Sequence, residues 1–146
     1  MTRERILDTR PDGSVAITCP DENGIRYLML GSDWWQHPWH ERPWWFWIVQ
    51  FQRKVARGVK PAAAYKFCRA MVTGGLSRRE AIELIGEYSV GHLGVALEIV
   101  DISEIPTDRT YRDAWRRSSN GGPIWVCEKA AQEIDEARMW RLYETA

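Results

Sequence analysis

Turn residues and helix caps divide this chain into short segments of different periodicity, and that division limits what it can fold into. Apolar residues on both sides of the turn sequence at residues 11–13 predict a β-hairpin, and residues 25–30 predict a third antiparallel strand ending near Gly31. Further along, helical spacing alternates with short β-branched runs. A small N-terminal β meander, central helices, late short strands and a C-terminal helix together predict an α+β fold.

Three central segments have the spacing of amphipathic helices. Residues 43–58 begin with a proline and end at a glycine, and residues 61–73 begin at a second proline. Residues 77–87 carry the strongest start signal, because Ser77 and Glu80 form a capping box and Leu76 is placed to pack on Ala81. The expected inward residues are Trp44, Trp47, Ile48, Phe51 and Val55, then Ala63, Phe67, Ala70 and Met71, then Ala81, Ile82 and Ile85.

The last third of the chain mixes both periodicities. Residues 95–100 predict a strand, residues 108–116 a short turn or helix, and residues 124–126 another strand. A final helix is predicted from Glu128 to about Tyr143, with Ala130, Ile134 and Ala137 inward. The length of 146 residues suits one domain. We expect a single domain, 1–146, made of the meander (1–31), a tryptophan-rich loop with a basic helix (32–58) and a helical and α+β part (59–146).

Several classes of protein do not fit the composition. The N-terminal MTRERILDTR is too polar for a secretory signal, and no apolar run is long enough to cross a bilayer. We therefore expect the protein in the cytoplasm, or assembled from it, away from membranes. Cys19, Cys68 and Cys127 are isolated and odd in number, which predicts free thiols, with neither a disulfide framework nor a zinc site.

A net charge of zero conceals a division of charge along the chain. Nine of the 20 Lys and Arg residues lie between Arg42 and Arg79, where there is no Asp or Glu. The flanking segments hold all 20 acidic residues. The basic segment and the residues just before it also hold six of the nine tryptophans, at positions 34, 35, 39, 44, 45 and 47. This pattern predicts a surface that meets an acidic partner.

Two interpretations of the basic helix stay open, and both can hold for different tryptophans. In the first, its aromatic face packs into the core and Arg53, Lys54 and Arg57 form a solvated outer face. In the second, tryptophans on an approach loop are exposed as anchors for a partner, since tryptophan and arginine are enriched at binding hot spots. The loop tryptophans concerned are Trp34, Trp35 and Trp39.

No catalytic motif accompanies this surface. His37 and His40 with Glu41 give only a weak metal signal, because Pro38 favours extended backbone between the two imidazoles. Asp33 could be drawn as an acid beside either histidine, but no nucleophile has a recognisable setting. We expect no metal, no cofactor and no enzymatic activity.

Part of the second half resembles a group of small uncharacterised phage and prophage proteins. In that group a helix beginning GLTxxEA precedes a strand, an LPxDRTFRxAW segment and a helix that starts with lysine and alanine. The resemblance covers about residues 73–141 and rests on Gly74-Gly75-Leu76-Ser77, Glu80-Ala81-Ile82, Ile99-Val100-Asp101, Ile105 to Arg116 with its DRTYRDAW string, and Lys129-Ala130. Cys127 stands where the pattern usually has an acidic residue, and the tryptophan-rich segment lies outside it.

The resemblance implies a phage or prophage source, with a role in or around the virion or during infection, and transfers no activity. Within DRTYRDAW, Tyr111 and Trp115 are spaced to fill one apolar side of a short helix capped by Asp108. Arg109 and Arg112 then have two open interpretations: a structural clamp, or a fork for a partner's phosphate or carboxylate. The carboxylates that a clamp would use are Asp101, Asp108 and Asp113.

These patterns together predict a non-enzymatic protein that acts through protein–protein contacts, foremost a virion structural or assembly component. The expected partners are other phage subunits or further copies of the chain. A second hypothesis is an infection-phase inhibitor that binds a host defence protein through acidic residues at 128, 133, 135 and 136. A nucleic-acid-binding accessory role ranks third, because Glu80, Glu83 and Glu87 would repel a phosphate backbone. The predicted partner-binding residues are Trp34, Trp35, Trp39, Arg53, Lys54, Arg57, Arg109 and Arg112.

Overall fold

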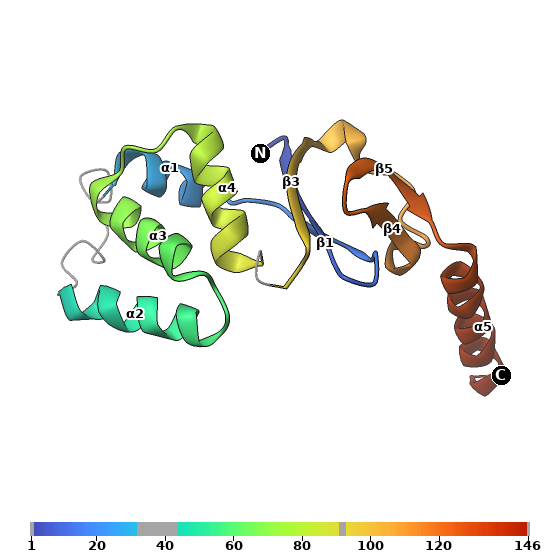
Figure 1. The fold of residues 1–146 in the computed structure, drawn as a ribbon. Helices are drawn as coiled ribbons and strands as arrows, with labels where there is room; N and C mark the ends of the chain where they lie inside the picture. Colours follow the sequence, from blue (N-terminus) through green and yellow to red (C-terminus); the bar gives the residue numbers. More distant parts are fainter. Residues whose placement is uncertain (1, 32–43, 91–92, 146) are drawn as a thin grey trace.

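The computed structural model describes residues 2–31, 44–90 and 93–145 (Figure 1). A three-stranded antiparallel sheet lies between a group of four helices on one side and a two-stranded hairpin on the other. A last helix extends away from the hairpin, at the end of the molecule opposite the helical group. The α+β prediction is confirmed. No helix in the described part of the chain is long and apolar enough to span a membrane.

The sheet is built around its first strand. β1 (Glu4–Thr9) pairs on one edge with β2 (Val15–Thr18) and on the other with β3 (Ala96–Asp101), giving the order β2-β1-β3. The turn joining β1 to β2 has Gly13 at φ 83°, a left-handed conformation that glycine adopts without steric cost. Asp12 braces this turn by accepting hydrogen bonds from the Ser14 amide and hydroxyl. The predicted hairpin and the predicted late strand are therefore both confirmed.

The third strand predicted for the meander is wrong. Residues 25–30 belong to helix α1 (Glu22–Leu30), and β3 occupies the edge of β1 where a third strand could pair. The run of turn residues before this segment is a helix start, since the Asp21 carboxylate accepts a hydrogen bond from the Gly24 amide. Ile25 and Leu28, three positions apart, are fully buried on one helical face.

The three predicted central helices are confirmed as α2 (Trp44–Ala56), α3 (Pro61–Thr73) and α4 (Arg78–Ser89). With α1 they bury a core against the face of the sheet that carries Ile6. The Ser77 cap also forms, since its hydroxyl accepts from the Glu80 amide at 3.2 Å. The Glu80 side chain bonds to the Ser77 hydroxyl rather than to the Ser77 backbone, so the reciprocal half of the capping box takes a different form.

Most predicted inward residues of these helices are buried or half-buried. Two expectations were wrong: Ile48 is 45% exposed on α2, and Ala137 is exposed on the last helix. Ile48 is displaced because α2 turns Trp47, Phe51 and Val55 toward its neighbours, and a helix can bury only one stripe. The side chain of Trp44 lies outside the described residues.

The ends of α1 and α3 cross at two glycines. Gly31 and Gly74 have φ of 72° and 66°, and a Cβ atom added to Gly74 would lie 2.6 Å from the backbone of Leu30. Immediately beside the crossing, the Gly75 amide donates to the Met29 carbonyl at 2.9 Å. The helices pack this closely only because neither glycine has a side chain.

The opposite face of the sheet is covered by the late hairpin. β4 (Trp115–Ser118) pairs with β5 (Gly121–Val126), and Trp115 is buried with Leu7, Val100 and Ile105 beneath the sheet. The region from 108 to 116, expected to be a short turn or helix, contains the 3-10 helix η3 (Arg112–Ala114) and the start of β4. A second 3-10 turn, η2 (Ile102–Glu104), follows β3.

The predicted C-terminal helix is α5 (Glu128–Glu144). Two contacts with the segment before η3 attach it to the body. Tyr111 donates its hydroxyl to the Asp135 carboxylate at 3.0 Å, and Arg138 donates to the Thr110 carbonyl at 2.6 Å. Ala130 and Ile134 are half-buried, but no residue of the helix is fully buried.

Candidate interaction surfaces

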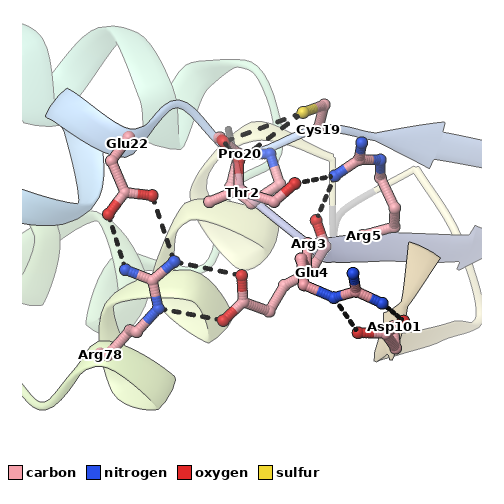
Figure 2. A network of polar contacts seen from close by, with 9 residues as sticks. All are labelled: Thr2, Arg3, Glu4, Arg5, Cys19, Pro20, Glu22, Arg78 and Asp101. Carbon is pink, nitrogen blue, oxygen red and sulfur yellow. Dashed lines mark hydrogen bonds and ion pairs between the residues drawn. The ribbon is translucent and has the colours of Figure 1, made fainter.

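Two of the nine basic residues of the charged segment, Arg78 and Arg79, form ion pairs within the chain. Figure 2 shows the Arg78 guanidinium between two carboxylates, bonded to Glu4 at 3.0 and 3.1 Å and to Glu22 at 2.7 and 3.1 Å. This fork ties the starts of β1, α1 and α4 together. The hydrogen bonds from Arg78 hold the pKa of each glutamate below its ordinary value. Arg79 pairs with Glu83 one turn along α4 at 3.1 Å.

Lys54 contacts an aromatic ring instead of a carboxylate. Its Nζ lies 4.4 Å from the centre of the Tyr88 ring, which is stacked on Phe67 with centroids 3.8 Å apart. Desolvation, followed by repulsion from Arg57, lowers the pKa of Lys54, and burial raises the pKa of Tyr88 to about 12. Lys54, predicted as a partner-binding residue, therefore joins α2 to α4 through a cation–π contact.

The remaining described cations of the segment are exposed on α2, on α3 and in the loop between them, and we call these two helix surfaces with their exposed residues the basic face. Arg53 and Arg57, two predicted binding residues, lie on its α2 side. Trp45, Ile48 and Tyr65 are exposed on the same two helices, at 57%, 45% and 59%. Neither α2 nor α3 contains an acidic residue. The cations of the basic face are Arg53, Arg57, Lys60, Lys66 and Arg69.

Arg109 and Arg112, also predicted as binding residues, are exposed beside η3. Among the described residues, two of the three carboxylates suggested for a clamp, Asp101 and Asp108, have other contacts. Asp101 pairs with Arg3 at 3.1 Å, which lowers the pKa of Asp101 to about 2. Asp108 accepts from the Thr110 amide and hydroxyl, closing a turn before η3 rather than capping it. Both arginines thus face solvent at the hairpin end of the molecule, away from the basic face.

The sequence interpretation missed a group of exposed apolar residues at the end of the last helix. Met139, Trp140, Leu142 and Tyr143 lie in the last turns of α5 and are 66–78% exposed. The sequence does contain a signal for this group. The large apolar residues near the end of the helix are not among its expected inward residues, which are two alanines and one isoleucine. We call Met139, Trp140 and Tyr143, with the exposed acids around them, the acidic–aromatic face of α5. Its acids are Glu133, Glu136 and Glu144.

A groove of about 630 Å³ lies between α4 and the outer side of β3. Charges of both signs line it, with Lys60 and Arg79 near Glu83 and Glu87.

Cys68 is a buried residue of α3, and burial raises the pKa of its thiol, which disfavours a reactive thiolate. All three cysteines are free, as predicted.

Trp34, Trp35 and Trp39 lie outside the described residues, as do Asp33, His37, His40 and Glu41. Within residues 2–31, 44–90 and 93–145, no three His, Cys, Asp or Glu side chains converge as metal ligands would. Comparisons with protein-family models, with curated proteins and with solved structures find no match for the chain. The arguments about function therefore rest on the surfaces themselves.

Proposed function

We propose that this protein is a non-enzymatic phage or prophage component that acts through protein–protein contacts, as a structural or assembly part of the particle. The observation that carries the proposal is the exposed apolar end of α5. Four large apolar side chains project from a helix that buries none of its residues. Contiguous exposed apolar side chains of this kind mark interaction sites, because a solvent-facing position gives them no reason to be apolar.

Two further features support this proposal. The basic face supplies exposed tryptophan and arginine, the residue types enriched where one side chain contributes much of a binding free energy. The phage-like pattern of residues 73–141 supports the proposed source. In this proposal the protein acts in the host cytoplasm, in the virion, or in both.

The test is quantitative mass spectrometry of purified particles from the phage or prophage that encodes the chain. We expect a fixed copy number per particle. A double variant, Trp140→Ala with Leu142→Ala, should lower the copy number, while Arg141→Ala on the same helix should leave it unchanged. Absence of the wild-type protein from particles, with normal expression during infection, would overturn the proposal.

The second candidate is an infection-phase inhibitor of a host protein. It is favoured by the exposed acids of α5, Glu128, Glu133, Asp135 and Glu136, which offer a negative surface to a basic, nucleic-acid-binding partner. This candidate requires a stable complex with one host protein and absence from particles. A pull-down from infected cells, repeated with Glu133→Lys and Glu136→Lys, separates it from the first proposal.

A further inference from the structure

The acidic–aromatic face of α5 is free because contacts on the other side hold the helix. Asp135 and Arg138 bond to the body, and Ala130 and Ile134 are half-buried beside them. At 3.6 residues per turn, these positions define one side of the helix. Met139, Trp140 and Tyr143 project from the remaining circumference, together with Glu133, Glu136 and Glu144. Lys129 is exposed on the same side, so the free face combines apolar side chains with three acids and one cation and has a net negative charge.

The basic face of α2 and α3 has the complementary composition. Trp45, Ile48, Tyr65 and Val72 are exposed apolar residues of these two helices, and every charged side chain on α2 and α3 is positive. Lys60, between the two helices, also lines the groove that contains Glu83 and Glu87. The lengths also match: α5 has 17 residues and α2 and α3 have 13 each, or about 25 and 20 Å at 1.5 Å per residue. If a helix of this size packed across α2 and α3, it would cover apolar side chains on both partners. The contact would also bring charges of opposite sign together.

The two faces of one molecule cannot meet each other. In Figure 1, α2 and α3 lie at one end, α5 extends from the other, and the sheet and the β4–β5 hairpin stand between them. The contact must therefore join different copies. Because each copy offers two unlike faces, the interface is heterologous, which builds chains or rings unless two copies exchange helices reciprocally.

We infer that α5 of one copy packs against the basic face of a second copy of this chain. The inference rests on the proposed function, in that it names the partner for a protein that works by protein–protein contact. It assigns the exposed apolar end of α5 to the exposed apolar residues of α2 and α3, and the acids of α5 to the cations of the basic face.

Sedimentation velocity on the full chain over a range of concentrations tests this inference. The wild type should show oligomers that grow with concentration and weaken at high salt, because exposed charges are screened. Arg53→Glu with Arg57→Glu should remove association, and so should Glu133→Lys with Glu136→Lys. All four side chains are exposed, so the fold should persist, and circular dichroism checks this. The control, Arg26→Glu, reverses an exposed charge on α1, outside both faces, and should associate as the wild type does.

Mixing the two charge-reversed variants is the decisive step. The unchanged α5 of the first variant can pack on the unchanged basic face of the second, and the reversed α2 of the first can meet the reversed α5 of the second. The mixture therefore regains two complementary contacts. We expect mixed oligomers that contain both variants in equal number, from two proteins that are each monomeric alone. A wild type that stays monomeric, an Arg53→Glu, Arg57→Glu variant that still associates, or a mixture that stays monomeric would each overturn the inference.

The outcome is separable from that of the proposed function. A chain that is monomeric in solution yet present in particles at fixed copy number would overturn the self-association alone. A chain that self-associates through these faces but is absent from particles would overturn the particle role alone.

Discussion

At the scale of single residues, Trp115 shows how the most distinctive string of the sequence is used. The last residue of DRTYRDAW is 2% exposed and packs among Leu7, Val100 and Ile105 under the sheet. Its bulk fills the space between the sheet and the β4–β5 hairpin. The tryptophan of this string is thus a core residue that positions the hairpin, while the arginines of the same string remain on the surface.

Replacement of this core tryptophan should be costly. We expect Trp115→Ala to lower the free energy of unfolding by about 3–5 kcal/mol, from lost apolar burial and the cavity left behind. Trp125→Ala provides the matched control, because Trp125 lies on the paired strand but is 54% exposed. Urea denaturation measures both. Similar losses in the two variants would contradict the burial assigned to Trp115.

Arg78 gives a prediction about pH. Its hydrogen bonds lower the pKa of Glu4 and of Glu22 in the folded chain from the ordinary value of 4.5. A carboxyl whose folded pKa is depressed contributes stability that is fully present above its unfolded pKa and is lost as the pH falls through its folded pKa. We therefore expect the urea midpoint of the wild type to fall progressively below about pH 4.5.

The comparison with Arg78→Gln isolates this contribution. Without the guanidinium, both glutamates should titrate nearer their ordinary values, so the variant should start lower at neutral pH and lose less on acidification. Arg79→Gln removes the neighbouring cation, which pairs with Glu83 on the exposed surface of α4, and should keep the wild-type profile. Parallel pH profiles for wild type and Arg78→Gln would show that the fork contributes nothing.

At the scale of elements, the sequence predicted helices that carry a strong local start signal and strands that follow a clear turn. The Ser77 cap, the proline starts and the 11–13 turn all act within a few residues, so they can be read from the chain. The strand predicted within the segment from Glu22 to Leu30 was wrong because a turn and a helix cap use the same residue types. Only β3, some 65 residues beyond this segment, decides which element completes the sheet.

The sequence predicted only part of the candidate surfaces. The uninterrupted basic segment correctly placed Arg53 and Arg57 on the exposed side of α2. Lys54 could not be distinguished from them, because its contact with Tyr88 on α4 is a tertiary one. The exposure of Trp140 and Tyr143 likewise depends on α5 leaving the body, and local sequence does not encode that departure.

The crossing of α1 and α3 provides a prediction at this scale. Gly74→Ala should be strongly destabilising, because its Cβ would meet the Leu30 backbone at 2.6 Å and the helices would have to separate. Gly75→Ala is the control: it too has a positive φ, but a Cβ there meets nothing within 4 Å. Both variants place a side chain at a positive φ, which costs of order 1–3 kcal/mol. Gly74→Ala adds the clash with Leu30, so its thermal midpoint should fall further. Equal losses would contradict the close approach.

At the scale of the whole molecule, the basic segment and the acidic C-terminal helix, which are separate in the sequence, lie at opposite ends of the fold. The positive charges of α2 and α3 lie beyond the helical side of the sheet, and the acids of α5 lie beyond the hairpin. A net charge of zero gives no overall repulsion between copies. Unlike ends therefore attract when copies approach in line, which is the arrangement that the proposed contact requires.

Removal of α5 tests whether this helix serves association rather than folding. We expect a chain ending at Cys127 to fold and unfold cooperatively, since α5 buries no residue and the three cores lie in the remaining elements. The thermal midpoint of the wild type should rise with protein concentration, because association stabilises the folded state by mass action. The midpoint of the shortened chain should not depend on concentration. Differential scanning calorimetry at several concentrations measures both, and a rise of equal size in the two proteins would place the self-association outside α5.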